Sequence, residues 1–116
     1  MSREIDIGRL SPDDLPIAWP DVAEVLAERG EDLLRTHSPR ELFTNVLAGI
    51  YDLWLATEDD EIQLVGFCAW ERHDLASYYH VVWVGGDGLD IAKQAMIRLE
   101  HYACLHGAKE LVLGGR

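Results

Sequence analysis

Positive charge is scarce in this sequence. Its 116 residues include 21 Asp and Glu but only 10 Lys and Arg, which gives a formal net charge of -11 at pH 7. A field of this sign repels nucleic acids and anionic membranes and leaves no basic stripe for phosphate contacts. We therefore expect neither nucleic acid nor membrane among the partners. The same field opposes a polyanionic cofactor unless local geometry overcomes it.

Cysteine and long apolar runs are scarce as well. The 2 cysteines, Cys68 and Cys104, fall in a predicted strand and a predicted helix, as is typical of buried reduced thiols. No apolar run approaches the roughly 20 residues that span a bilayer. The N-terminus is charged throughout and does not look like a secretory signal. We expect an intracellular protein, or one packed into something that is assembled inside a cell.

Linkers, repeats and low-complexity segments are lacking too. The hydrophobic fraction of 48% favours a globular chain over a disordered one, and the length fits one domain over residues 1–116. Histidine is present, but no pair has a metal-ligand spacing such as His-x-x-x-His. We therefore expect no metal site at His73, His80, His101 or His106.

Local patterns locate the elements of the first third of the chain. Residues 4–10 alternate between polar and apolar side chains, which predicts a half-buried strand. Pro16 and Pro20 complicate the next stretch, because proline suits the first turn of a helix and breaks its interior. We therefore predict a first helix from about Pro20 that ends at Gly30 or continues through Leu34.

The rest of the chain reads as one more helix, a run of strands, a long helix and a last strand. Ser38-Pro39-Arg40-Glu41 has the pattern of a capping box and predicts the second helix. Strands are predicted over residues 51–57, 62–70, 78–84 and 109–113, and a helix over residues 90–106 that ends at Gly107. The last crossover predicts that its two strands are parallel. The predicted class is α/β (α+β), with an antiparallel meander in a mixed central sheet and helices on both faces.

The stretch Val81-Val82-Trp83-Val84-Gly85-Gly86-Asp87-Gly88-Leu89-Asp90 predicts a buried strand, a glycine turn and a helix start. Free N–H groups at such a helix start can hold phosphates. This turn carries Asp87 and Asp90 but no Arg, Lys or Gln. Two unit charges about 5 Å apart interact by roughly 3 kcal/mol at an effective dielectric of about 20. Helix capping by these carboxylates is the competing explanation, at about 1 kcal/mol.

The order of elements resembles the acyl-CoA N-acyltransferase fold of the GNAT superfamily. The segments Trp83-Val84-Gly85-Gly86 and Gly107-Ala108-Lys109-Glu110-Leu111-Val112-Leu113-Gly114-Gly115-Arg116 resemble degenerate GNAT-like proteins of tailed bacteriophages. The resemblance implies a coenzyme A pyrophosphate loop with the pattern Arg or Gln, two residues, Gly, one residue, Gly or Ala. Aligned from Gly85 to Asp90, only Gly88 matches. The cofactor-binding candidates are Val84, Gly85, Gly86 and Gly88.

The resemblance also implies two strands after the fifth, whereas nothing follows Arg116 here, so we expect a GNAT-like domain truncated after strand 5. An edge strand left without neighbours favours a protein partner or self-association. The aromatic side chains on one face of the meander either pack under the first two helices, which is the expectation for most of them, or form a second contact surface. For catalysis, Glu71 is a candidate general base and Tyr102 a candidate proton donor. The competing explanation is a carboxylate at the rim and a tyrosine at the edge of the core.

Two main functional hypotheses follow from these patterns. The acidic loop favours a non-catalytic GNAT-like domain with a structural or interaction role, such as a virion-associated bacteriophage component, with no cofactor. The alternative is an acetyl-CoA-dependent N-acetyltransferase with an atypical pyrophosphate loop. A third hypothesis, which rests only on the acidic composition, is a binding module for a cationic protein or a small amine.

Overall fold

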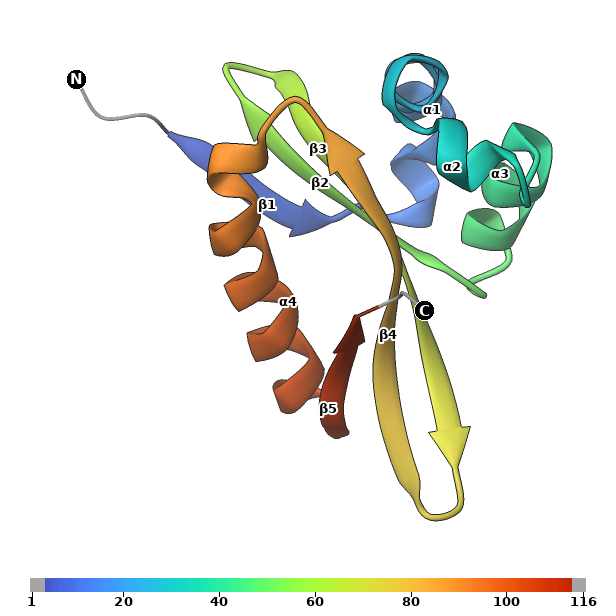
Figure 1. Cartoon of the computed structure of the whole chain (residues 1–116), viewed down its shortest axis with the longest axis vertical. Coiled ribbons are helices and arrows are strands. Elements are labelled where there is room, and N and C mark those ends of the chain that lie inside the picture. Colours follow the sequence, from blue (N-terminus) through green and yellow to red (C-terminus); the bar gives the residue numbers. More distant parts are fainter. Residues whose placement is uncertain (1–3, 114–116) are drawn as a thin grey trace.

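A single five-stranded sheet organises the chain, in the order β1-β2-β3-β4-β5 (Figure 1). The computed structural model describes residues 4–113. Strands β1 to β4 pair antiparallel, and β4 pairs parallel with β5, as the crossover predicted. The predicted fold class is confirmed. The strands are β1 (Ile5–Arg9), β2 (Asp52–Glu58), β3 (Glu61–His73), β4 (Ala76–Gly86) and β5 (Ala108–Leu113), and the α-helices are α1 (Leu15–Arg29), α2 (Glu31–Leu34), α3 (Pro39–Leu47) and α4 (Ala92–Leu105).

Helix α1 begins five residues before the predicted start, so Pro20 lies inside it. The prediction was wrong because proline forfeits only one backbone hydrogen bond and already has a helical φ, while burial stabilises the whole turn. Val22 and Leu26 supply that burial and are 0% and 1% exposed. Gly30 ends the helix, as predicted. The capping box of α3 is also confirmed, with both hydrogen bonds between Ser38 and Glu41 at 3.1 Å.

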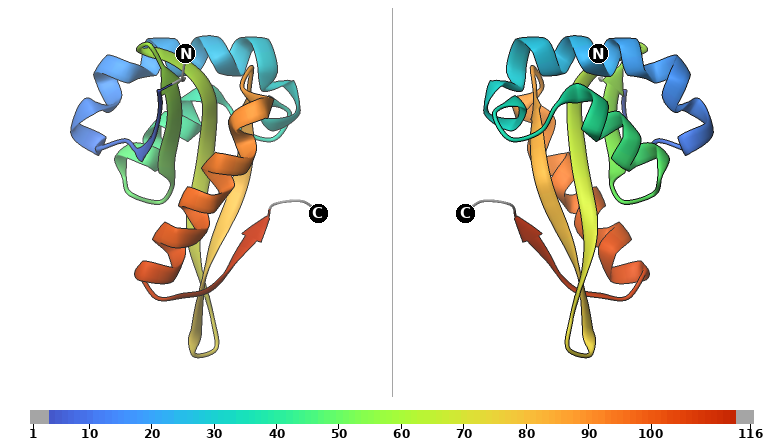
Figure 2. Two further views of the ribbon diagram at one scale, coloured as in Figure 1. Left: turned by 90° about the vertical axis from the view of Figure 1, so that its left-hand side faces the viewer. Right: turned by 90° about the vertical axis from the view of Figure 1, so that its right-hand side faces the viewer.

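The helices cover the two faces of the sheet unequally (Figure 2). Helices α1 to α3 lie over one face, where Leu15, Val22 and Leu42 pack against Leu53 and Phe67. Helix α4 lies on the other face, where Leu99 and Ala103 pack against a second cluster that includes Trp54, Cys68 and Tyr79. Short 3-10 turns precede α1 and α4, at Pro12–Asp14 and Leu89–Ile91.

The β3–β4 hairpin is longer than predicted and projects beyond the helices (Figure 1). The sequence underestimates it because Arg72 and His73 near the tip are polar and exposed, and Gly85 and Gly86 at the other end have no side chain to continue the apolar alternation. A β-bulge lies within β4: Phe67 faces Trp83 while Cys68 faces Val81, so Val82 is the extra residue. Val82 and Trp83 therefore both pack toward α1–α3, and Val81 packs toward α4.

Strand β5 is the last strand of the sheet in the part of the chain that the structure describes. It pairs with β4 from Ser77 to Val81, and beyond Val81 β4 is paired with β3 alone. Figure 2 shows the end of β5 pointing away from the upper half of β4. Association through β5 stays a prediction, and Gly114-Gly115-Arg116 lies outside the described residues. Among the residues described, no helix is long and apolar enough to cross a membrane.

Candidate functional site

The glycine turn after β4 is packed against β3. The N–H groups of Asp87 and Gly88 both donate to the carbonyl oxygen of Gln63, at 2.9 and 3.0 Å. Gly86 has a φ of 142°, and a Cβ there would lie 2.3 Å from that same oxygen. A Cβ on Gly88 would approach the Ile91 side chain to 2.9 Å. These glycines therefore have a packing role, and two of the turn's N–H groups are already used.

Asp87 is paired across the fold with Arg29, the last residue of α1, with 2.5 Å between Oδ1 and Nη2. Both side chains are more than half exposed. The Asp87 charge, which opposes phosphates in the sequence argument, is thus matched by a cation 58 positions earlier in the chain. The surroundings stay acidic, however, because Asp21, Glu24, Glu28, Asp60, Glu61 and Asp87 line a hollow of about 400 Å³ between α1 and the β2–β3 turn.

The start of α4 is the part of this region that fits a phosphate group. Its N-cap is Ile91, which makes no side-chain capping bond, so the predicted carboxylate cap is not at that position. The first-turn N–H groups of such a helix and its positive dipole end favour an anion. Lys93 lies exposed in that first turn. The Ile91 N–H itself donates to the Gly88 carbonyl oxygen at 2.9 Å, and the exposed Asp90 directly precedes Ile91. The fit to coenzyme A phosphates therefore rests on the N–H groups of the first turn of α4 and on Lys93.

The glycine-turn candidates have other contacts. Val84 packs toward α4. A Cβ on Gly85 would lie 2.3 Å from the Trp83 ring. Gly86 and Gly88 fit closely against β3, as described above. All four sequence candidates thus have a structural explanation, and none of these contacts points to a phosphate.

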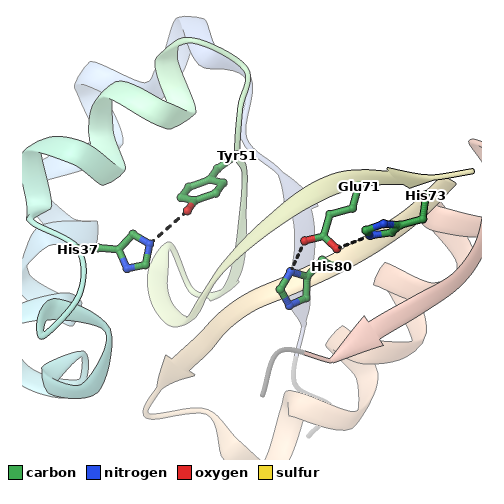
Figure 3. Close-up of polar contacts among 5 residues, drawn as sticks. All are labelled: His37, Tyr51, Glu71, His73 and His80. Carbon is green, nitrogen blue, oxygen red and sulfur yellow. Dashed lines mark hydrogen bonds and ion pairs between the residues drawn. The ribbon is translucent and has the colours of Figure 1, made fainter. Parts of the chain in front are cut away.

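A second group of polar side chains lies at the other end of β4. His80 Nδ1 is 3.0 Å from Glu71 Oε2, and His73 Nε2 is 3.5 Å from Glu71 Oε1 (Figure 3). Glu71 and His73 come from β3, and His80 comes from β4. Because Val81 faces α4, His80 points to the opposite face, on the side of α1–α3. The bulge at Val82 therefore places the Glu71–His80 pair on the α1–α3 face of the sheet, in the part of the hairpin that projects beyond these helices (Figure 1).

The hydrogen bond to Glu71 selects one tautomer of the neutral His80 ring. An ionised carboxylate only accepts hydrogen bonds, so His80 Nδ1 must carry the proton that is donated to Glu71. The lone pair of the neutral ring is then on Nε2. His80 is 28% exposed, which leaves it accessible to a small molecule. A carboxylate that orients a histidine in this way is a recurrent arrangement for general-base chemistry.

The upper border of the same face carries a further histidine. Tyr51 Oη and His37 Nε2 lie 3.2 Å apart, between the start of β2 and the segment after α2 (Figure 3). The Tyr51 ring packs near Phe67, with 6.3 Å between the ring centroids. This pair joins the helical layer to the sheet beside the polar group of the hairpin. Among the described residues, no group of three or more His, Cys, Asp or Glu side chains is arranged to hold a metal ion.

Tyr102, the candidate proton donor, lies on the other face of the sheet. Its ring packs on Trp54, Tyr79 and His106, with centroids 5.1, 5.3 and 4.3 Å away. Trp70 also points to this side, so the next residue, Glu71, points away from it. The structure therefore does not bring the two catalytic candidates together.

A hydrogen-bond chain crosses the buried side of the hairpin. Trp54 Nε1 donates to Tyr79 Oη at 2.8 Å, and Tyr79 Oη donates to Asp52 Oδ2 at 2.6 Å. Burial, and then the bond to Asp52, raises the pKa of Tyr79 well above its ordinary value. Burial also raises the pKa of the Cys68 thiol to about 12, with Asp52 adding to the effect. This side of the hairpin is thus a structural network in which Asp52 accepts from Tyr79 and also pairs with Arg9, whose Nη1 lies 3.5 Å from Asp52 Oδ1.

Comparison with solved structures identifies the fold as that of GNAT-family acetyltransferases. A ribosomal-protein-alanine N-acetyltransferase from Brucella melitensis biovar Abortus matches with a TM-score of 0.73, at 16% identity over 97% of this chain and 81% of that one. Glucosamine-6-phosphate N-acetyltransferase from Arabidopsis thaliana matches with a TM-score of 0.67, at 17% identity over 97% and 83%. A predicted acetyltransferase from Clostridium acetobutylicum, solved with acetyl-CoA, matches at 0.68, with 16% identity over 97% and 81%. No family model and no curated protein sequence matches the chain.

These matches overturn the expectation of a non-catalytic, virion-associated structural protein. The matched proteins named above are acetyltransferases, and the resemblance to degenerate bacteriophage proteins has no support among them. The expectation of no cofactor is likewise unsupported, because matched proteins were solved with acetyl-CoA or CoA. Its physical basis was the acidic loop. That argument omitted Arg29, which the sequence places far from Asp87 and the fold brings beside it.

Sequence reasoning considered His80 only as a metal ligand and missed its pairing with Glu71. The available signal was the alternation Tyr78, Tyr79, His80, Val81, in which every second side chain is polar on one face. Sequence alone does not locate the bulge at Val82, and the bulge decides which face that is.

Proposed function

We propose that this protein is an N-acyltransferase that transfers an acyl group from coenzyme A to a primary amine. The observation that carries the proposal is the Glu71–His80 pair, held at 3.0 Å on the accessible face of the hairpin just below the bulge in β4. The GNAT fold supports the reaction class as an analogy, because the solved structures that match are acetyltransferases.

The residues of the chain have distinct roles in this proposal. Bound acyl-CoA supplies a thioester carbonyl carbon that an amine nitrogen can attack. His80 Nε2 accepts the proton of the attacking amine as the N–C bond forms and the C–S bond breaks. Glu71 stabilises the resulting imidazolium through the proton on Nδ1. The proton that His80 takes from the amine balances the proton that the departing thiolate must gain. A neutral amine and a thioester thus become an amide and a free thiol with no net proton change.

The first turn of α4 is the proposed anchor for the donor. Its backbone N–H groups, Lys93 and Arg29 are the positive groups near the loop that suit phosphates. The acidic hollow beside Arg29 acts against them. Coenzyme affinity is therefore set by a local positive site within a negative field, and we expect the dissociation constant to fall as salt screens the surrounding carboxylates.

Calorimetry and a thiol-release assay test the proposal together. We expect the unmodified protein to bind coenzyme A at sub-millimolar concentration and to release coenzyme A thiol from acetyl-CoA when primary amines are added. Glu71→Gln keeps the shape of the side chain and removes its charge, and we expect kcat to fall about 10²-fold or more. Glu100→Gln is the matched control, because Glu100 is an exposed glutamate on α4 that is remote from the pair.

Two results would contradict the proposal. One is an absence of coenzyme binding at concentrations up to about the millimolar values typical of weak ligands. The other is equal activity of the Glu71→Gln and Glu100→Gln proteins, because Glu71 would then have no part in the reaction.

A further inference from the structure

A hollow of about 230 Å³ opens beside the Glu71–His80 pair, between the β3–β4 hairpin and β5. Its lining consists of Glu71, His73, Tyr78, Glu110 and Val112. The strand register explains how these residues meet: Tyr78 of β4 lies between Glu71 of β3 and Glu110 of β5. One row across three strands therefore presents a carboxylate, a phenol ring and a second carboxylate on one face.

This row has the composition of a site for a positively charged group. A carboxylate on either side supplies charge, and an aromatic face between them attracts a cation through its quadrupole. The ring of His73 lies beside Tyr78, with 5.7 Å between the centroids, and borders the site. Glu71 is engaged by the two histidines, whereas Glu110 has no ion pair among the described residues. Glu110 is thus the carboxylate available to a cation from outside.

The position relative to His80 gives the hollow a role in acceptor binding. Val112 lies beside His80 in the next strand, and Glu110 lies two residues before Val112. With strands about 4.8 Å apart and a rise of about 3.3 Å per residue, the Cα atoms of His80 and Glu110 are roughly 8 Å apart along the diagonal. Between them lie the Tyr78 ring and the apolar Val112. An aliphatic spacer can therefore cross from one to the other over apolar surface.

We infer that the hollow selects acceptors with a second positive charge, which Glu110 and Tyr78 hold while the reacting nitrogen lies at His80. The inference rests on the acyltransferase function proposed above and specifies its substrate class as α,ω-diamines and related polycations. A spacer of about five carbons fits the diagonal, since a C–C bond is about 1.5 Å long and the chain zigzags. Simple alkylamines lack the second charge and should be poor acceptors.

The test compares two acceptors of equal length in three proteins. We measure kcat/KM for acetylation of 1,5-diaminopentane and of pentylamine by the unmodified protein, Glu110→Gln and Glu4→Gln. Glu4 is exposed and precedes β1, at the opposite edge of the sheet from β5. Both variants lose one negative charge, so a general effect of net charge is the same in each. We expect the unmodified protein to favour the diamine by about tenfold or more, and Glu110→Gln to lose most of that ratio. Glu4→Gln should keep it.

A second readout separates this inference from the proposed function. Calorimetry without any donor measures 1,5-diaminopentane binding to the unmodified protein and to Glu110→Gln. Binding that Glu110→Gln weakens about tenfold supports the hollow as a cation site even if no amine is acetylated, in which case the acyltransferase proposal alone is wrong. Acetylation of both amines with an unchanged ratio in Glu110→Gln leaves the function standing and overturns the inference. Absence of both binding and acetylation overturns both.

Discussion

The two ends of β4 differ in how their sequence relates to their role. The upper end carries the glycine turn, which looks like a phosphate site in the sequence. In the structure its glycines pack on β3, and the N–H groups of Asp87 and Gly88 are bound to Gln63. The lower end carries no recognisable motif, yet it brings Glu71 and His80 together on an accessible face. A pattern of glycines thus reports backbone packing, whereas the reactive arrangement depends on register between strands.

The largest effect is expected at the lower end. His80→Gln removes the proposed base and keeps a polar side chain of similar size, so kcat should fall about 10²–10⁴-fold. The free energy of unfolding should change little, because His80 is partly exposed. Steady-state kinetics measure the fall in kcat, and denaturant unfolding of the same preparation measures the free energy of unfolding. Retained activity in a folded variant would show that the hairpin is not the reactive end.

The upper end should respond in the opposite way. Gly86→Ala introduces a Cβ at a φ of 142° and 2.3 Å from the Gln63 carbonyl oxygen, which the turn cannot accommodate without moving. We expect the free energy of unfolding to fall by about 1–3 kcal/mol. Gly107→Ala is a useful comparison, because its φ of 92° is strained too but nothing lies within 4 Å of a Cβ there. Equal losses in the two variants would mean that strain, and not contact with β3, fixes Gly86.

The buried groups on the α4 side of the hairpin should make stability depend on alkaline pH. The pKa of Cys68 is raised from 9.0 to about 12, and that of Tyr79 is raised from 10.0, so both groups stay neutral in the folded chain after they ionise in the unfolded one. Their stabilising contribution is complete below about pH 9 and is lost as pH rises toward 12. We expect the free energy of unfolding to fall by at most about 1.4 kcal/mol per pH unit per group over this range.

Denaturant titrations at pH 8, 9.5 and 10.5 measure this slope. Cys68→Ala should flatten the first part of the slope, whereas Cys104→Ala should not, because Cys104 is exposed. A slope that is the same in both variants would remove Cys68 as its source.

The smallest effect is expected from the ion pair at the upper end. Asp87→Asn releases Arg29 from its carboxylate partner and removes one negative charge from the entrance to α4. Coenzyme affinity should rise by up to about tenfold at low ionic strength, and the gain should shrink in high salt. Arg29→Gln should weaken binding. A gain from both substitutions would show that Arg29 has no contact with the donor.

Much of the fold could be predicted because its signals are local. The Ser38 capping box, the Gly30 helix end and the crossover to β5 each depend on a few residues or on a chirality rule, and each is confirmed. Helix α1 was misjudged at Pro20, where burial of Val22 and Leu26 outweighs the missing hydrogen bond. The lesson is that a local penalty of known size still has to be compared with the packing around it.

The candidate site could be predicted only in part, because its parts meet through the fold. Glu71 was a candidate from the sequence, but its partner comes from the neighbouring strand and not from Tyr102 on α4. Arg29 and Asp87 are separated by most of the sheet in sequence and are joined only when α1 crosses its upper edge. Neither pairing has a spacing that a single sequence can display.

The bulge at Val82 acts as a phase shift in the alternation of β4. Above it, Trp83 marks the face of α1–α3, and uninterrupted alternation would then turn His80 and Tyr78 toward α4 and turn Tyr79 outward. With the extra residue, the lower half of the strand is inverted, so His80 and Tyr78 point to the side of α1–α3 while Tyr79 is buried. Deleting Val82 would exchange the two faces of the lower half of β4, while β3, which carries Glu71, would keep its orientation.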